Sequence, residues 1–134
     1  PGDTPHLDNS LMKGELITSV EIPVNDALAK NSLYMKVRDR ASYAFALVSV
    51  AAALDMDGNI MTDVRLAMGG VAHKPWRLTT AENFLKGKNA SEENFKQAAT
   101  IAMKGAKGYG QNNFKLKMAY NTIIQTLTTA SGLS

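Results

Sequence analysis

The chain has 134 residues, of which 45% are hydrophobic and 20% charged, so its composition fits one globular domain and excludes disorder and fibrous repeats. Fifteen Lys and Arg against twelve Asp and Glu give a net charge of +3 that is spread along the chain, which argues against a dedicated nucleic-acid surface. The absence of Cys excludes disulfides, a thiol nucleophile and Fe–S ligation by this chain. No apolar run approaches the roughly 20 residues of a membrane span, and we expect a soluble protein.

The first residues are rich in turn formers and lack periodicity, so we expect residues 1–14 to form a linker arm that leads in from an upstream domain. Residues 15–134 are expected to form a single domain. Glu15–Ile22 alternates, with Leu16, Val20 and Ile22 on one face, which predicts a half-buried strand that ends at Pro23. Ile17 breaks this pattern because it falls on the polar face.

Residues 25–32 are long enough for a loop or a short helical turn, and a second alternating strand follows at Leu33–Arg38. Its predicted outward face carries Tyr34, Lys36 and Arg38. Tyr43–Leu54 is apolar or small on both faces; its Ala content allows a helix, but its Val residues favour a buried central strand.

Asp57-Gly58-Asn59 predicts a hairpin turn, because Gly and Asn tolerate positive φ. The alternating segment Ile60–Met68 is then the antiparallel partner strand, and Gly69-Gly70 ends it and permits a close backbone approach. His73 and Trp76 fall in the loop that follows, where we expect Trp76 to pack the loop onto the sheet.

The last third has helical periodicity. Thr79 and Glu82 have the spacing of a capping box before a short helix that stops at Gly87. Ser91 caps a second helix with Phe95 in its apolar stripe, and Asn112 or Asn113 caps a third that ends near Gly132. The predicted fold class is α+β: an antiparallel sheet of three to four strands followed by three helices packed on one face.

The uncovered face of this sheet is the main candidate site, because Ile17, Tyr34, Lys36 and Arg38 are predicted to line it. A solvated face with one stray apolar residue explains the same pattern, since scattered surface apolar residues are common. A flat anionic ligand or a partner domain is the functional alternative.

Other motifs predict no chemistry. Gly105–Gly110 resembles a phosphate loop but follows a helix, whereas a dinucleotide fingerprint follows a strand, so a helix stop and linker is favoured. His6 and His73 have no neighbouring ligands at metal-binding spacing, and the Ser residues lack a nucleophile-elbow motif. We therefore expect neither a metal site nor a catalytic residue in this chain.

Three blocks resemble a known family: Glu15–Pro23 (ELITSVEIP), Tyr34–Ala52 (YMKVRDRASYAFALVSVAA) and Val64–Arg77 (VRLAMGGVAHKPWR). In this order they are similar to the C-terminal domain of the FAD-binding, or medium, subunit of molybdenum hydroxylases. This family includes xanthine dehydrogenase, aldehyde oxidoreductase and carbon monoxide dehydrogenase. The resemblance implies the CO dehydrogenase flavoprotein C-terminal fold.

The resemblance also implies a shared cofactor. FAD would be held mainly by an N-terminal FAD-binding domain with Gly- and Ser-rich loops, which this chain lacks, and Lys36 and Ile17 match flavin-contacting positions of the family. The molybdenum cofactor and the Fe–S clusters would lie in partner subunits of a hetero-oligomer, in the cytoplasm or in an exported periplasmic complex. The implied role is to help close the flavin site during electron transfer from the clusters to an acceptor, and the chain alone would not be catalytic.

Two other functions use the same surface. A small basic nucleic-acid-binding domain would use Tyr34, Lys36, Arg38 and Arg40, with steeply salt-dependent binding. A non-catalytic interaction module would bind a protein partner without flavin. Both explain fewer features of the sequence than the flavin hypothesis.

Overall fold

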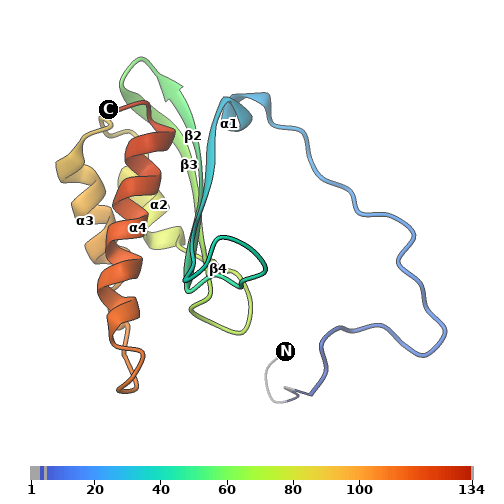
Figure 1. Cartoon of the computed structure of the whole chain (residues 1–134). Coiled ribbons are helices and arrows are strands. Elements are labelled where there is room, and N and C mark those ends of the chain that lie inside the picture. Colours follow the sequence, from blue (N-terminus) through green and yellow to red (C-terminus); the bar gives the residue numbers. More distant parts are fainter. Residues whose placement is uncertain (1–3, 5, 134) are drawn as a thin grey trace.

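A computed structural model describes residue 4 and residues 6–133 (Figure 1). Its centre is an antiparallel sheet in the order β1-β2-β3-β4, formed by Asn31–Val37, Val48–Asp57, Ile60–Gly69 and Trp76–Arg77. The helices are α1 (Asp26–Lys30), α2 (Thr79–Leu85), α3 (Glu92–Ala102) and α4 (Phe114–Ala130). In Figure 1, α2, α3 and α4 lie on one face of the sheet, and the short α1 lies at one end of the other face, which is otherwise open. This arrangement confirms the predicted α+β class.

The β2–β3 hairpin forms at the predicted turn. Asp57 pairs with Ile60, and Gly58 has the positive φ of 57° that glycine adopts without steric cost. A register shift next to Asp55 leaves Thr62 unpaired in the ladder, and its hydroxyl donates to the Asp55 carbonyl at 3.0 Å. The long hairpin therefore supplies the two central strands.

The core lies between the sheet and the three helices. Alternate residues of β2 and β3, such as Val50, Leu54 and Leu66, point toward the helices and are buried. Phe95 of α3 is fully buried in the same core. Ala98 and Ala99 are fully buried, and their small side chains suit a helix that packs closely. None of the helices in the described part of the chain is long and apolar enough to cross a membrane.

The helix caps agree only in part with the prediction. The Ser91 hydroxyl accepts from the Asn94 amide at 3.3 Å, as predicted for α3. The capping box at Thr79 is wrong: α2 has no side-chain cap, because Glu82 bonds to Leu66 and Arg77 instead. Asn113 precedes α4 without capping it.

The predicted strand at 15–22 is not part of this sheet. Residues 15–25 have no regular secondary structure, and Leu16 and Ile17 are 82% and 63% exposed. No residue of this segment belongs to the core between the sheet and the helices, so its apolar side chains stay exposed. In Figure 1 the segment before α1 runs away from the sheet.

The second correction concerns Tyr43–Leu54. The strand begins only at Val48, and residues 38–47 form a loop in which Tyr43 and Phe45 are 97% and 98% exposed. Tyr43 has a φ of 50°, which a strand residue cannot adopt. We name residues 38–47 the aromatic loop.

Candidate functional site

The open face of the sheet carries the candidate site. In β1, Tyr34 and Lys36 alternate with the helix-facing Leu33, Met35 and Val37, as the sequence predicted. The register sets Tyr34 opposite Ala51, and Ala51 opposite Ala67. Small side chains therefore form a floor across the two central strands.

This floor lies in a shallow depression of about 440 Å³. Tyr34 borders it on the β1 side, and Arg65 and Arg77 border it on the β3 and β4 side. A flat depression with an aromatic edge and cationic rims suits a planar anionic group or a partner surface.

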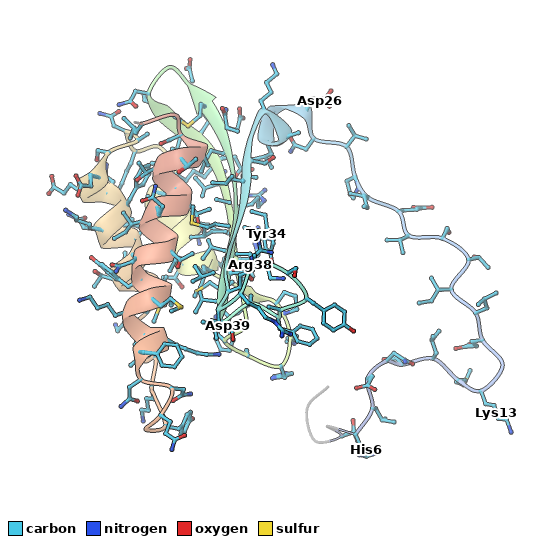
Figure 2. The ribbon with its side chains drawn as sticks, viewed as in Figure 1. His6, Lys13, Asp26, Tyr34, Arg38 and Asp39 are labelled. Atoms are coloured by element: carbon cyan, nitrogen blue, oxygen red, sulfur yellow. The ribbon has the colours of Figure 1, made fainter. Side chains whose placement is uncertain are left out.

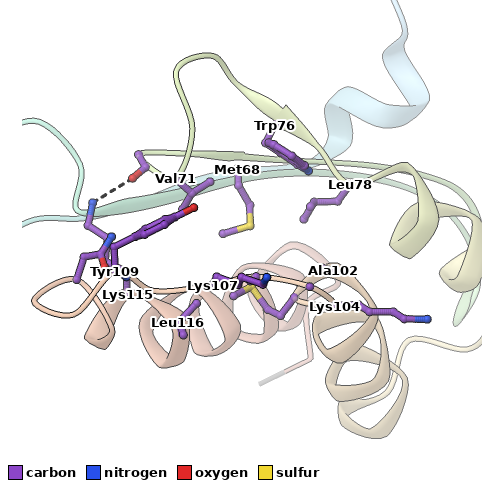
Figure 3. A pocket seen from close by; sticks show the side chains of 15 residues that line it. Met68, Val71, Trp76, Leu78, Ala102, Lys104, Lys107, Tyr109, Lys115 and Leu116 are labelled. Atoms are coloured by element: carbon purple, nitrogen blue, oxygen red, sulfur yellow. Dashed lines mark hydrogen bonds between the residues drawn. The ribbon is translucent and has the colours of Figure 1, made fainter.

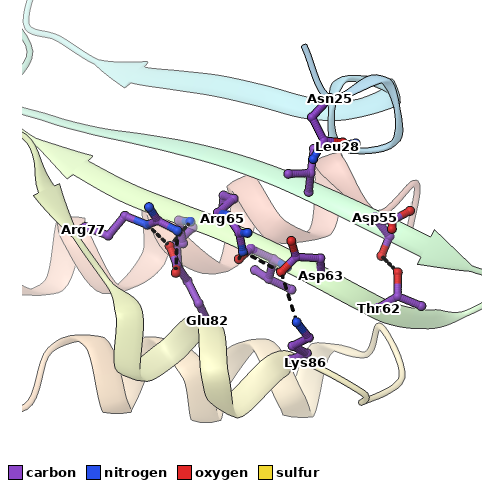
Figure 4. A network of polar contacts seen from close by, with 11 residues as sticks. Asn25, Leu28, Asp55, Thr62, Asp63, Arg65, Arg77, Glu82 and Lys86 are labelled. Atoms are coloured by element: carbon purple, nitrogen blue, oxygen red, sulfur yellow. Dashed lines mark hydrogen bonds and ion pairs between the residues drawn. The ribbon is translucent and has the colours of Figure 1, made fainter. Parts of the chain in front are cut away.

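A buried carboxylate fixes Arg77 on this rim (Figure 4). The Arg77 Nε and Nη2 donate to the two oxygens of Glu82 at 2.6 and 3.0 Å. Glu82 is 5% exposed, and its Oε1 also accepts from the Leu66 amide at 2.7 Å. The hydrogen bond to Glu82 raises the pKa of Arg77 against the opposing effect of burial. Arg77 is thus a permanently charged and oriented group.

Arg65 is paired in a similar way. Its Nη1 donates to Asp63 at 2.5 Å, and Lys86 Nζ lies 3.6 Å from the same carboxylate. Burial alone would raise the pKa of Asp63, but the hydrogen bonds from Arg65 and the Val64 amide, with the charges of Arg65 and Lys86, lower it. Both arginines on this rim therefore have a carboxylate partner.

Lys36 differs from these arginines. It is exposed, and it makes no ion pair within the part of the chain that the structure describes. Its ammonium is therefore available to an anionic partner at the β1 side of the face.

The aromatic loop lies at one end of the open face (Figure 2). Arg40 Nη2 donates to the Tyr43 carbonyl at 2.5 Å. Gly70, with a φ of 75°, lies so close that an added Cβ would be 2.9 Å from the carbonyl oxygens of Ala46 and Leu47. The predicted close approach at the glycine pair is confirmed, and it ties the loop to the end of β3.

The other predicted positions are dispersed. Ile17 lies in the extended segment before α1 rather than on the sheet, and Arg38 lies in the aromatic loop. His6 and His73 are exposed, and the described residues contain no group of His, Cys, Asp and Glu that could hold a metal. Gly105–Gly110 links α3 to α4, as expected. Trp76, expected to pack against the sheet, lies in β4 and stays 56% exposed.

Sequence reasoning missed Arg65 and Arg77 as site residues. The alternation of Ile60–Met68 already set Arg65 on the outward face, so that residue could have been found. Arg77 could not, because its place on the rim depends on the buried Glu82 from α2.

Comparison with known proteins identifies the family. Residues 32–130 match the family model of the CO dehydrogenase flavoprotein C-terminal domain. The chain is 44% identical over 130 residues to the aldehyde oxidoreductase FAD-binding subunit PaoB of Escherichia coli. It is 41% identical over 88 residues to the glyceraldehyde dehydrogenase medium chain of Sulfolobus acidocaldarius. The matches cover 97% and 66% of this chain but 37% and 30% of those relatives.

Solved structures share the fold. Quinoline 2-oxidoreductase from Pseudomonas putida 86 superposes with a TM-score of 0.69 at 25% identity, over 76% of this chain and 37% of that one. Carbon monoxide dehydrogenase from Hydrogenophaga pseudoflava gives 0.67 at 24% identity, over 74% and 36% of the two chains. The chain therefore belongs to the CO dehydrogenase flavoprotein C-terminal domains, which form the C-terminal part of the FAD-binding subunit of molybdenum hydroxylases.

Proposed function

We propose that the open face of the sheet covers the flavin of an FAD that another domain holds, and thereby assists electron transfer from Fe–S clusters to an acceptor. The observation that carries this proposal is Lys36, whose ammonium has no ion-pair partner among the described residues. It lies two residues along β1 from Tyr34, which borders the floor of small residues. When bound, the flavin supplies the two-electron chemistry.

Each part of the face has a physical role. The Ala51 and Ala67 methyl groups allow close contact with a planar ring and exclude water from it. Tyr34 supplies an aromatic contact, and the Lys36 ammonium offsets the negative charge that accompanies reduction. Arg65 and Arg77 are already paired, so they act mainly on orientation at the opposite rim.

We further propose that the segment before α1 packs against the domain that holds FAD. Residues 1–14 would form the linker arm, and Glu15–Ile22 would form its predicted strand there, with Ile17 as the apolar contact to the flavin. Two observations support this. The apolar side chains of the segment are exposed. The segment also lies outside the family model, which begins at residue 32, whereas the match to the E. coli relative covers 97% of the chain.

The remaining redox centres would belong to partner subunits. This chain has no Cys with which to ligate an Fe–S cluster. The molybdenum cofactor would likewise be held elsewhere in a hetero-oligomer. The fully exposed Tyr43 and Phe45 suit a protein interface, where aromatic residues are enriched.

The test is Lys36→Met in the intact subunit that contains the FAD-binding domain. The reduction potential of the bound flavin should fall by tens of millivolts, because about 1.4 kcal/mol of lost charge stabilisation corresponds to about 30 mV for a two-electron couple. Lys117→Met, on the exposed side of α4, is the matched control and should leave the potential unchanged. If both variants keep the potential and the FAD content of the wild type, the open face does not cover the flavin.

A further inference from the structure

A second cavity lies on the opposite side of the sheet. It has a volume of about 420 Å³ and opens between the end of β3, β4 and the linker that joins α3 to α4. Figure 3 shows Trp76 and Met68 on the sheet side and Lys107 and Leu116 on the linker side. This volume lies in the range of small-molecule sites.

The interior is apolar and its entrance is aromatic. Met68 and Leu78 are almost fully buried at its floor, and Leu116 closes it from α4. Trp76 and Tyr109 line it with large exposed rings. Side chains of this kind favour a flat apolar ligand over a polar one.

The charges around the cavity are all positive. Three lysines line it, and no Asp or Glu among the described residues does. Lys115 Nζ donates to the Gly70 carbonyl at 3.1 Å, and Lys104 points away from the labelled interior residues in Figure 3. Lys107 makes no hydrogen bond or ion pair within the described residues, and Figure 3 shows its ammonium beneath Met68. Lys107 is exposed to solvent, so it is a free cation at the edge of the apolar interior.

The linker wall is held in place by local hydrogen bonds. Asn112 Oδ1 accepts from the Tyr109 amide at 2.6 Å, and Asn113 Oδ1 accepts from the Gly110 amide at 3.3 Å. Gly108 has no room for a side chain, since an added Cβ would collide with the Asn113 amide group. A wall fixed before binding lowers the ordering cost for a ligand.

From these features we infer that the cavity binds a small aromatic monocarboxylate. The ring would lie among Met68, Leu78 and Trp76, and the carboxylate would meet the Lys107 ammonium. A phosphate fits less well, because it needs several convergent donors and no Arg of the described chain lines the cavity. The cavity is separate from the open face, so the test of this proposal does not depend on the proposed flavin role.

The experiment uses the full chain and 4-methylbenzoate as the probe. Trp76 is the single Trp, so its fluorescence reports occupancy directly, and calorimetry gives the same constant independently. We expect saturable binding with a dissociation constant of about 1 mM or tighter for this ligand size. The uncharged 4-methylbenzamide should bind up to about fivefold more weakly, which is the effect of one partly exposed ion pair.

Variants locate the site. Lys107→Met keeps most of the side-chain stem and should weaken 4-methylbenzoate by the same factor of up to about fivefold, without changing the weak binding of the amide. Lys117→Met is the matched control outside the cavity and should bind like the wild type. Absence of saturation, equal binding of acid and amide, or equal weakening by both variants would each overturn the proposal; equal binding of acid and amide would indicate an apolar occupant instead.

Discussion

Replacing Glu82 tests the polar network beneath the open face. Its carboxylate accepts three hydrogen bonds, one from the Leu66 amide and two from Arg77. In Glu82→Ala the buried Leu66 amide loses its partner, which costs about 1–3 kcal/mol. The ion pair adds at most about 1 kcal/mol, because Arg77 is 55% exposed and solvent screens it. The free energy of unfolding should therefore fall by about 1–4 kcal/mol.

Glu82→Gln separates the two contributions. The Gln carbonyl can still accept from Leu66, so only the charge and one bond to Arg77 are lost, and the cost should be about 1 kcal/mol. Urea unfolding followed by Trp76 fluorescence and circular dichroism gives both values, with an unchanged m-value as the check on two-state behaviour. Glu92→Gln removes a fully solvated pair with Lys96 and is the control, expected to match the wild type. Equal losses in the Ala and Gln variants would refute the argument that most of the destabilisation comes from the unpaired Leu66 amide.

Three further predictions address charge, backbone and cofactor. Asp63→Asn should be less stable than the wild type at neutral pH, and the two melting temperatures should converge below about pH 4. A carboxylate whose pKa is lowered by folding stabilises the protein above its pKa in the unfolded state, and this stability is lost as the pH falls through its pKa in the folded state. Parallel melting profiles of the two proteins would contradict this. Gly70→Ala should lower the free energy of unfolding by about 1–3 kcal/mol in urea titrations, since its φ is positive and two carbonyls crowd the site, whereas Gly58→Ala, with positive φ but open space, should cost less. The isolated chain should purify without stoichiometric flavin, as measured by its visible absorbance, because the FAD pyrophosphate would be held by another domain; a yellow protein would contradict this.

The sequence predicted most of the fold because each correct element carries a local signal. The hairpin at Gly58 depends on a turn whose residues tolerate positive φ. β1 alternates between half-buried and exposed residues, and β3 alternates from Val64 onward, after the register shift beside Thr62. The periodic apolar stripe of α3, with its Ser91 cap, likewise needs no tertiary information. Elements of this kind are fixed by neighbours in sequence.

The errors share a different cause. The alternation at Glu15–Ile22 indicates a strand with one buried and one exposed face, but it does not identify the sheet that the strand would join. The capping box failed because Glu82 satisfies a backbone amide sixteen residues away, which no local pattern encodes. Arg77 was missed for the same reason. Partners distant in sequence thus decided each of these cases.

Under the proposed function, Lys36 is the main free cation that the structure describes on the open face, because the other charges there are paired. The two arginines on the far rim each have a carboxylate partner, so their field at the floor is largely cancelled. Lys36 has no such partner among the described residues, and an ammonium on a flexible stem can approach an anion that arrives over Ala51. Replacing Arg65 should therefore alter stability more than the flavin potential, whereas replacing Lys36 should do the reverse.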